Sequence, residues 1–171
     1  MDYNNQILQI PFTYAVLGGT FDVLHAGHRF LLEAANVLGD TIHVGLTSDK
    51  YVKDIRKGHE VTPYQYRKLG IESYFFHERI DVKRLYIYEI NDKYGDLINS
   101  DSIYNHYTTV VIASEETYLD LVHINAVRRS KKLEPFYVFV IPIMAAEDGR
   151  QISSTRIRNG EIKTNGEVIK K

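Results

Sequence analysis

The chain has 171 residues, 44% hydrophobic and 25% charged, which is the composition of an ordinary globular domain. Its net charge of −1 gives no reason to expect nucleic acid or an acidic membrane as a partner, and no apolar run is long enough to cross a bilayer. The lack of cysteine excludes disulfides and thiolate chemistry. Together with a polar N-terminus that has no signal-peptide pattern, it favours a cytoplasmic protein.

Apolar runs alternate with helix-periodic stretches along the chain. After an N-terminal arm (1–11), the runs predict strands at Phe12–Gly18, Thr41–Thr47, Val82–Ile90, Thr108–Ala113 and Phe136–Ile143. Helices are expected at His28–Leu38 (closed by Gly39), Tyr64–Phe76 (behind Pro63), Ser114 to about Lys132, and Ser153 to Gly160. A polar segment at Lys50–His59 and a loop at Asn91–Asn105 fill two of the connections. His43, inside the second strand, is interpreted as a structural or solvent-facing histidine rather than a ligand.

This alternation predicts one α/β domain over residues 1–171, a Rossmann-like doubly wound five-stranded parallel sheet with helices on both faces. In such sheets ligands bind beyond the carboxyl ends of the strands, at the point where the strand order reverses. The first strand ends at Gly18, the fourth at Ala113, and the fifth just before a serine cluster. We therefore expect these three ends to border one cleft.

The stretch from Gly18 to His28 reads as a glycine turn between a strand and a helix, the usual place for a phosphate in an α/β protein. Gly18 and Gly19 allow a sharp turn and a close approach of ligand to backbone. His25 and His28 are three residues apart and would share one face of a first helical turn. Two imidazoles and a helix N-terminus would then converge on a volume suited to a polyphosphate.

Other sites are disfavoured. The sequence has no Walker loop, no G-x-G-x-x-G fingerprint and no G-x-S-x-G elbow. The pair His25 and His28 could instead seed a zinc site, but zinc requires a third protein ligand and none is offered nearby, so no metal site is assigned to the protein. An isolated Ser-Ser-Thr is usually only a helix cap.

The stretch GGTFDVLHAGH resembles the GGTFD…HxGH signature of the HIGH-motif nucleotidyltransferases, and ISSTRIR at 152–158 is similar to that superfamily's ISSTxIR element. Nucleotidyl transfer needs little covalent help, because an incoming phosphate is already a nucleophile. The protein must align two anions and neutralise the charge that develops between them. Hydroxyls of Ser153, Ser154 and Thr155 and the charge of Arg158 would add to the imidazoles. Arg156 is two positions from Arg158, so both cannot easily face the same phosphate.

Further stretches resemble the phosphopantetheine adenylyltransferases of the archaeal and eukaryotic branch over roughly residues 12–166. These are Gly45–Asp49, Pro63-Tyr64 with Arg67, Ser114–Thr117, Asn125 with Arg128, and Ala146–Gly149. The resemblance implies that ATP and 4′-phosphopantetheine give 3′-dephospho-CoA and pyrophosphate, with Mg²⁺. CoA or dephospho-CoA would be product-like ligands, and the protein would be a monomer or a small homo-oligomer without a dephospho-CoA kinase.

Residue roles follow from the resemblance. His28 would stabilise the transition state beside His25, and both would be catalytic. ATP would be bound by a set drawn from both motifs: Gly18, Gly19, Thr20, Phe21, His25, His28, Ser153, Ser154, Thr155 and Arg158. Ser114–Thr117 would lie near the ribose or adenine. The acceptor would be bound by Thr20, by Lys53 or Lys57 (Lys50 is a weaker candidate), and by Arg128.

Three alternatives remain open at this point. The acceptor could be FMN, nicotinamide mononucleotide, or glycerol 3-phosphate with CTP as the donor, because the core motifs are shared among these enzymes. A nucleotide-sensing module would retain the pocket but is expected to lose a histidine or the serine motif, and both are intact. A flavodoxin-like redox protein would bind flavin on the same type of fold.

Overall fold

A computed structural model describes residues 10–55 and 60–170 of the chain. Its centre is a five-stranded sheet in the order β3-β2-β1-β4-β5, and every pair of neighbours is parallel. The strands are β1 (Phe12–Gly19), β2 (Gly39–Thr47), β3 (Leu85–Ile90), β4 (Thr109–Ser114) and β5 (Tyr137–Ile141). The predicted Rossmann-like parallel sheet is confirmed.

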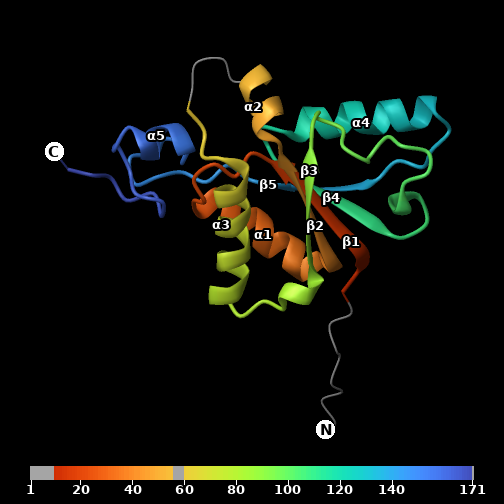
Figure 1. Ribbon diagram of the computed structural model, residues 1–171, viewed down its shortest axis with the longest axis horizontal. Helices are drawn as coiled ribbons and strands as arrows, with labels where there is room; N and C mark the ends of the chain where they lie inside the picture. Colours follow the sequence, from red (N-terminus) through yellow and green to blue (C-terminus); the bar gives the residue numbers. More distant parts are fainter. Residues whose placement is uncertain (1–9, 56–59, 171) are drawn as a thin grey trace, which may run out of the picture.

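The helices cover both faces of this sheet (Figure 1). They are α1 (Ala26–Leu38), α2 (Asp49–Ile55), α3 (Tyr64–His77), α4 (Tyr118–Ser130) and α5 (Ser154–Arg158), with short 3₁₀ turns at Val82–Arg84 and Ile103–Asn105. One apolar core joins α1 and α3 to the sheet, and a second joins α4 to the opposite face. In the ranges 10–55 and 60–170, no helix has the length and apolarity needed to span a bilayer.

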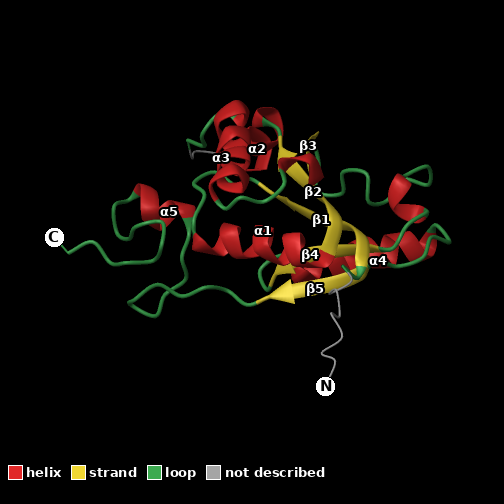
Figure 2. Ribbon diagram, turned by 90° about the horizontal axis from the view of Figure 1, so that it is seen from below, coloured by secondary structure: helices red, strands yellow, loops and turns green. Residues whose placement is uncertain are grey.

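The reversal of strand order lies between β1 and β4, which pair with each other at the centre of the sheet. From β1 the chain winds outward through β2 to β3, and then crosses to β4 and β5. The segment after β5, which carries α5, extends beyond the carboxyl ends of the strands (Figures 1 and 2). This arrangement leaves a crevice at the switch point, as expected for a doubly wound sheet.

Several element boundaries differ from the sequence prediction. The first helix begins at Ala26 rather than His28, and the second strand begins at Gly39 rather than Thr41. Val82–Arg84 forms a 3₁₀ turn ahead of β3, and Ser114 ends β4, so that only Glu115–Thr117 form the turn before α4. The polar segment after β2 contains α2, which was not predicted because Val52 is its only buried residue.

Gly39 ends α1, as predicted, but in an extended conformation that leads directly into β2. Its amide donates to the Ala35 carbonyl. A Cβ at this position would lie 2.5 Å from the Ala15 nitrogen and 2.6 Å from the Ala15 Cβ, closer than side chains normally approach. Glycine is therefore required here by the close approach of α1 to β1 rather than by a left-handed turn.

Of the two roles that the sequence left open for His43, structural or solvent-facing, the structure shows the structural one. It is 3% exposed, and its Nδ1 lies 2.8 Å from the Tyr104 hydroxyl, within a group of tyrosines on the α4 face of the sheet. Burial lowers the pKa of His43 from 6.5 to about 4. The imidazole is therefore neutral at pH 7.

This burial makes stability dependent on pH. His43 of the unfolded chain takes up a proton as the pH falls through 6.5, whereas the folded chain does so only near 4, so stability is lost across this interval. Between pH 7.5 and 4.5 the free energy of unfolding should therefore fall, and we expect His43→Phe to reduce that fall by about 1–2 kcal/mol. Urea unfolding of both proteins at the two pH values measures this, and equal losses would contradict it.

Candidate active site

A cleft of about 940 Å³ opens at the carboxyl ends of β1, β2, β4 and β5. From the first motif it is lined by Gly18, Gly19, Thr20, Phe21, His25 and His28, and from the second by Ser153, Ser154 and Thr155. The glycine-histidine motif after β1 and the serine motif at 152–158 therefore meet in one cavity, as the alternation of strands and helices predicted. A volume of this size is at the upper end for a small-molecule site and can accommodate a nucleotide together with a second substrate.

The turn after β1 is shaped by Phe21. This residue has φ of +48°, a conformation that is rare for a side chain other than glycine, and it is 2% exposed. Its ring packs 4.9 Å from the His28 ring and beneath Gly19, where an added Cβ would approach the ring to 3.1 Å. Phe21 therefore fixes both the glycine turn and one face of His28.

The rings of His25 and His28 are stacked, with centroids 3.8 Å apart. His25 is 8% exposed, and its Nδ1 has no hydrogen-bond partner among the described residues. Burial lowers its pKa to about 4, against an opposing effect of the Glu116 carboxylate. His25 is therefore neutral at pH 7.

His28 is oriented by the backbone. Its Nδ1 lies 3.1 Å from the carbonyl oxygen of Val23, and since a carbonyl only accepts, Nδ1 carries the hydrogen. Nε2 can then donate a hydrogen bond of its own only when the ring is protonated. The geometry suits an imidazolium that donates to a phosphate oxygen while it remains attached to the loop.

The second motif is held in place by the segment after β5. Arg156 donates to the Gln151 carbonyl at 2.9 Å and pairs with Asp148 and Glu161. Ala146, Ile152 and Ile162 form a small core that packs against Ala26 at the start of α1. The amide of Ala26 also donates to the Thr164 carbonyl at 2.9 Å, so this segment connects the two motifs directly.

Arg158 does not line the cleft. Its guanidinium forms an ion pair with Asp22, whose other carboxylate oxygen accepts from the Thr62 amide at 2.7 Å. Arg158 therefore joins α5 to the turn after β1 and to the segment ahead of α3. In this arrangement its charge is directed to a protein carboxylate rather than into the cavity.

Arg128 is also absent from the cleft, in contrast to its predicted role as a substrate ligand. The side chain is 1% exposed and donates to the Glu134 and Leu97 carbonyls and to Asn105, and it stacks on the Phe136 ring. All of these partners belong to the packing of α4 against its neighbours. The structure thus gives Arg128 a structural role in the packing of α4.

Of the lysines proposed for the acceptor, the structure describes Lys50 and Lys53, and neither lines the cavity. Lys53 is in the last turn of α2, is exposed, and does not line the cavity, although Tyr51 and Ile55 of the same helix do. Lys57 is outside the described residues. Among the described residues, the one lysine that lines the cavity is Lys93, which lies in the segment predicted as a loop (Asn91–Asn105) and was not among the predicted site residues.

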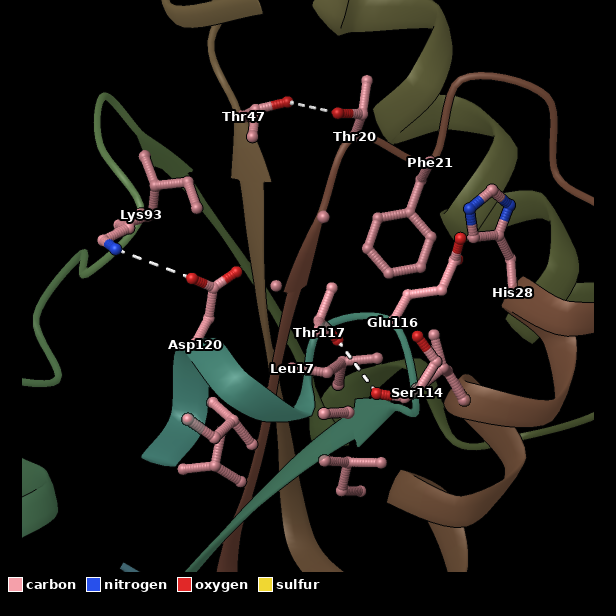
Figure 3. Close-up of a pocket in the computed structure, with 18 of the residues that line it drawn as sticks. Leu17, Thr20, Phe21, His28, Thr47, Lys93, Ser114, Glu116, Thr117 and Asp120 are labelled. Carbon is pink, nitrogen blue, oxygen red and sulfur yellow. Dashed lines mark hydrogen bonds and ion pairs between the residues drawn. The ribbon is translucent and has the colours of Figure 1, made fainter. Parts of the chain in front are cut away.

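Lys93 belongs to the segment that follows β3, and its ammonium lies 3.5 Å from the Asp120 carboxylate on α4. Figure 3 shows this pair on one side of the pocket, with Phe21 and His28 on the other. The segment could have been recognised as part of the site, because it follows a strand whose carboxyl end lies at the same edge of the sheet. Ser114, Glu116 and Thr117 line the cleft as expected.

Comparisons with known proteins agree with this geometry. The family model described as cytidylyltransferase-like matches residues 16–160. The chain is 33% identical to the phosphopantetheine adenylyltransferase of Methanothermobacter thermautotrophicus, covering 94% of this chain and 92% of the relative. It is 35% identical to that of Pyrococcus abyssi, covering 95% and 99%. A protein of unknown function from Archaeoglobus fulgidus has a similar crystal structure, with TM-score 0.60, 25% identity, and coverage of 75% and 88%.

Proposed function

Because the chain belongs to the phosphopantetheine adenylyltransferase family, within the cytidylyltransferase-like enzymes, we propose that it adenylylates 4′-phosphopantetheine. The products are 3′-dephospho-CoA and pyrophosphate, which makes the chain an enzyme of CoA biosynthesis. The observation that carries the proposal is the single cleft in which the motif after β1 and the motif of α5 face each other. The similarity of the archaeal relatives, over nearly their whole length, supports the same acceptor.

In the proposed reaction an oxygen of the acceptor phosphate attacks the α-phosphorus of ATP. The new P–O bond forms as the bond from the α-phosphorus to the oxygen bridging it to the β-phosphorus breaks, and pyrophosphate leaves with that electron pair. No base is needed, because the attacking phosphate is already ionised. The protein aligns the two anions and stabilises the charge that develops during transfer.

The proposed roles of the lining residues are those that the resemblance implies, and the positions of these residues in the cleft support them. The imidazolium of His28 donates to the α-phosphate as charge develops, while neutral His25 avoids a second charge beside it. Ser153, Ser154 and Thr155 hold the ATP phosphates, and Ser114 to Thr117 lie near the ribose or adenine. Thr20 reaches both substrates from the turn after β1.

Magnesium is proposed to enter with ATP. Among the described residues no three His, Cys, Asp or Glu side chains form a metal site. Mg²⁺ is commonly held by substrate phosphates, several waters and one or two carboxylates, and the cleft supplies a carboxylate for such a site. Glu116 is the carboxylate that lines the cleft close enough to act on His25 and is the proposed protein contribution. The ion would neutralise the charge of the departing pyrophosphate.

The acceptor phosphate is proposed to bind Lys57 or Lys53. We expect alanine at the correct position to raise the KM for phosphopantetheine about tenfold or more, because a charge-assisted hydrogen bond to phosphate is lost. The ATP affinity should hardly change. Steady-state kinetics of Lys57→Ala and Lys53→Ala, each serving as control for the other, identifies the lysine. If the ATP affinity falls instead, the substituted lysine contacts ATP rather than the acceptor.

The function is tested by incubating the purified protein with ATP, Mg²⁺ and 4′-phosphopantetheine while pyrophosphate and dephospho-CoA are measured. FMN, nicotinamide mononucleotide, and glycerol 3-phosphate with CTP are run in parallel. Pyrophosphate release with phosphopantetheine alone, with dephospho-CoA formed in equal amount, is the expected result. Pyrophosphate release with another acceptor would support nucleotidyl transfer but would show that phosphopantetheine is not the substrate. ATP binding without release from any acceptor would indicate a nucleotide-sensing module.

A further inference from the structure

Two threonine hydroxyls lie next to each other where β1 and β2 end. Thr47, the last residue of β2, is 6% exposed, and its Oγ1 donates to Thr20 Oγ1 at 3.3 Å (Figure 3). Both residues line the cleft. Thr20 is half-buried, and it is the residue proposed above to reach both substrates.

Behind these threonines lies the buried guanidinium of Arg67 on α3, which is 2% exposed. It donates to the Thr20 carbonyl at 2.9 Å, to the Thr47 carbonyl at 2.8 Å and to the Thr47 hydroxyl at 3.4 Å. It also donates to the Thr62 carbonyl and to the Asp49 carboxylate. Arg67 does not itself line the cleft, so any effect on a ligand must pass through the residues it contacts.

The hydrogen bonds in this group have a fixed direction. A guanidinium can only donate, so Thr47 Oγ1 accepts from Arg67 and directs its own hydrogen to Thr20. Thr20 Oγ1 accepts in turn, which leaves the Thr20 hydrogen for a further acceptor. The chain of donors therefore runs from α3 through the end of β2 to the cleft.

We propose that Arg67 and Thr47 are positioning residues that fix the Thr20 hydroxyl as a donor toward a phosphate oxygen in the cleft. A hydroxyl that is already oriented loses less rotational freedom on binding and needs no rearrangement as charge develops. Consecutive hydrogen bonds also polarise one another, which strengthens the last donor. The assignment of the ligand as a substrate phosphate rests on the proposed function. The direction of the hydrogen bonds from Arg67 through Thr47 to Thr20 does not.

A double-mutant cycle on the two hydroxyls tests the proposal. Thr47→Val removes the relaying hydroxyl but leaves the bonds of Arg67 to both carbonyls possible, and we expect kcat/KM to fall about tenfold. In a Thr20→Val background the same change should cost less than about twofold, because the hydroxyl that it orients is already gone. Thr47→Ser retains the relay and should restore at least half of the activity.

The matched control is Thr109→Val. Thr109 is also a buried strand threonine, 3% exposed, whose hydroxyl donates to the Tyr107 carbonyl at 3.1 Å, and it does not line the cleft. We expect Thr109→Val to lower stability without changing kcat/KM. If Thr47→Val reduces activity equally with and without the Thr20 hydroxyl, Thr47 only supports the strand end, and the proposal is overturned.

The affinity for ATP with Mg²⁺, measured calorimetrically on the same proteins, separates this inference from the proposed acceptor. If pyrophosphate is released from ATP with none of the acceptors, the proposed function fails. The double-mutant cycle on Thr20 and Thr47 can still be completed from the ATP affinities. Coupling between positions 20 and 47 in ATP affinity would then support the relay. Additive losses would overturn it.

Discussion

His28→Ala will lower turnover about 100-fold or more while leaving ATP affinity nearly unchanged. The imidazole donates to the α-phosphate chiefly when charge develops there, so its removal costs more in the transition state than in the bound ground state. Single-turnover kinetics gives the chemical rate, and calorimetry with ATP and Mg²⁺ gives the affinity. An unchanged chemical rate in His28→Ala would show that His28 does not stabilise the transition state.

Two further variants separate chemistry from loop structure. His28→Asn has a side-chain amide that can replace the Nδ1 contact with the Val23 carbonyl but cannot supply Nε2, so it should be as slow as alanine. His77→Ala changes an exposed histidine at the end of α3 and should behave as the unmodified protein. If His28→Asn retains full activity, the imidazole serves only to hold the loop.

Gly39→Ala will destabilise the fold by about 3 kcal/mol or more, since the new methyl group collides with backbone as well as side chain. The added carbon would lie 2.5 Å from the Ala15 nitrogen, and α1 or β1 would have to move to admit it. Because α1 carries both histidines of the site at its start, activity should fall with stability. Chemical unfolding followed by circular dichroism measures the change.

Gly70→Ala is the matched control for this substitution. Gly70 lies inside α3, and apart from its own helix no heavy atom of the described residues is within 4 Å of the added carbon. Alanine there should stabilise the protein by about 0.5–1 kcal/mol, because glycine is a poor helix former. A loss of stability at Gly70 equal to that at Gly39 would show that packing against β1 is not the cause.

The first motif and its surroundings were predictable because their signals are local. An apolar run, two glycines and a periodic segment define a strand, a turn and a helix within thirty residues. The parallel sheet and the cleft at its switch point followed from the alternation of strands and helices, and this cleft holds both Ser153 and His28. These inferences needed no knowledge of which distant side chains touch.

Other features depend on contacts between distant residues. The start of α2 is supported by Asp49, which accepts from the Tyr64 amide and from Arg67 far along the chain. Arg67 and Arg128 are both buried arginines, yet Arg67 on α3 lies behind the cleft, whereas Arg128 on α4 bonds to the loops packed against that helix. Their roles are set by the carbonyls that surround them, and residue type and spacing do not reveal those neighbours.

The bond from Ala26 to the Thr164 carbonyl has a consequence for biosynthesis. A ribosome releases α1 early, but the segment that anchors its first turn emerges only after all five strands have been made. A nascent chain can therefore form most of its sheet while its nucleotide site is still incomplete. The first turn of α1 therefore gains its anchor only once the chain has been made through Thr164.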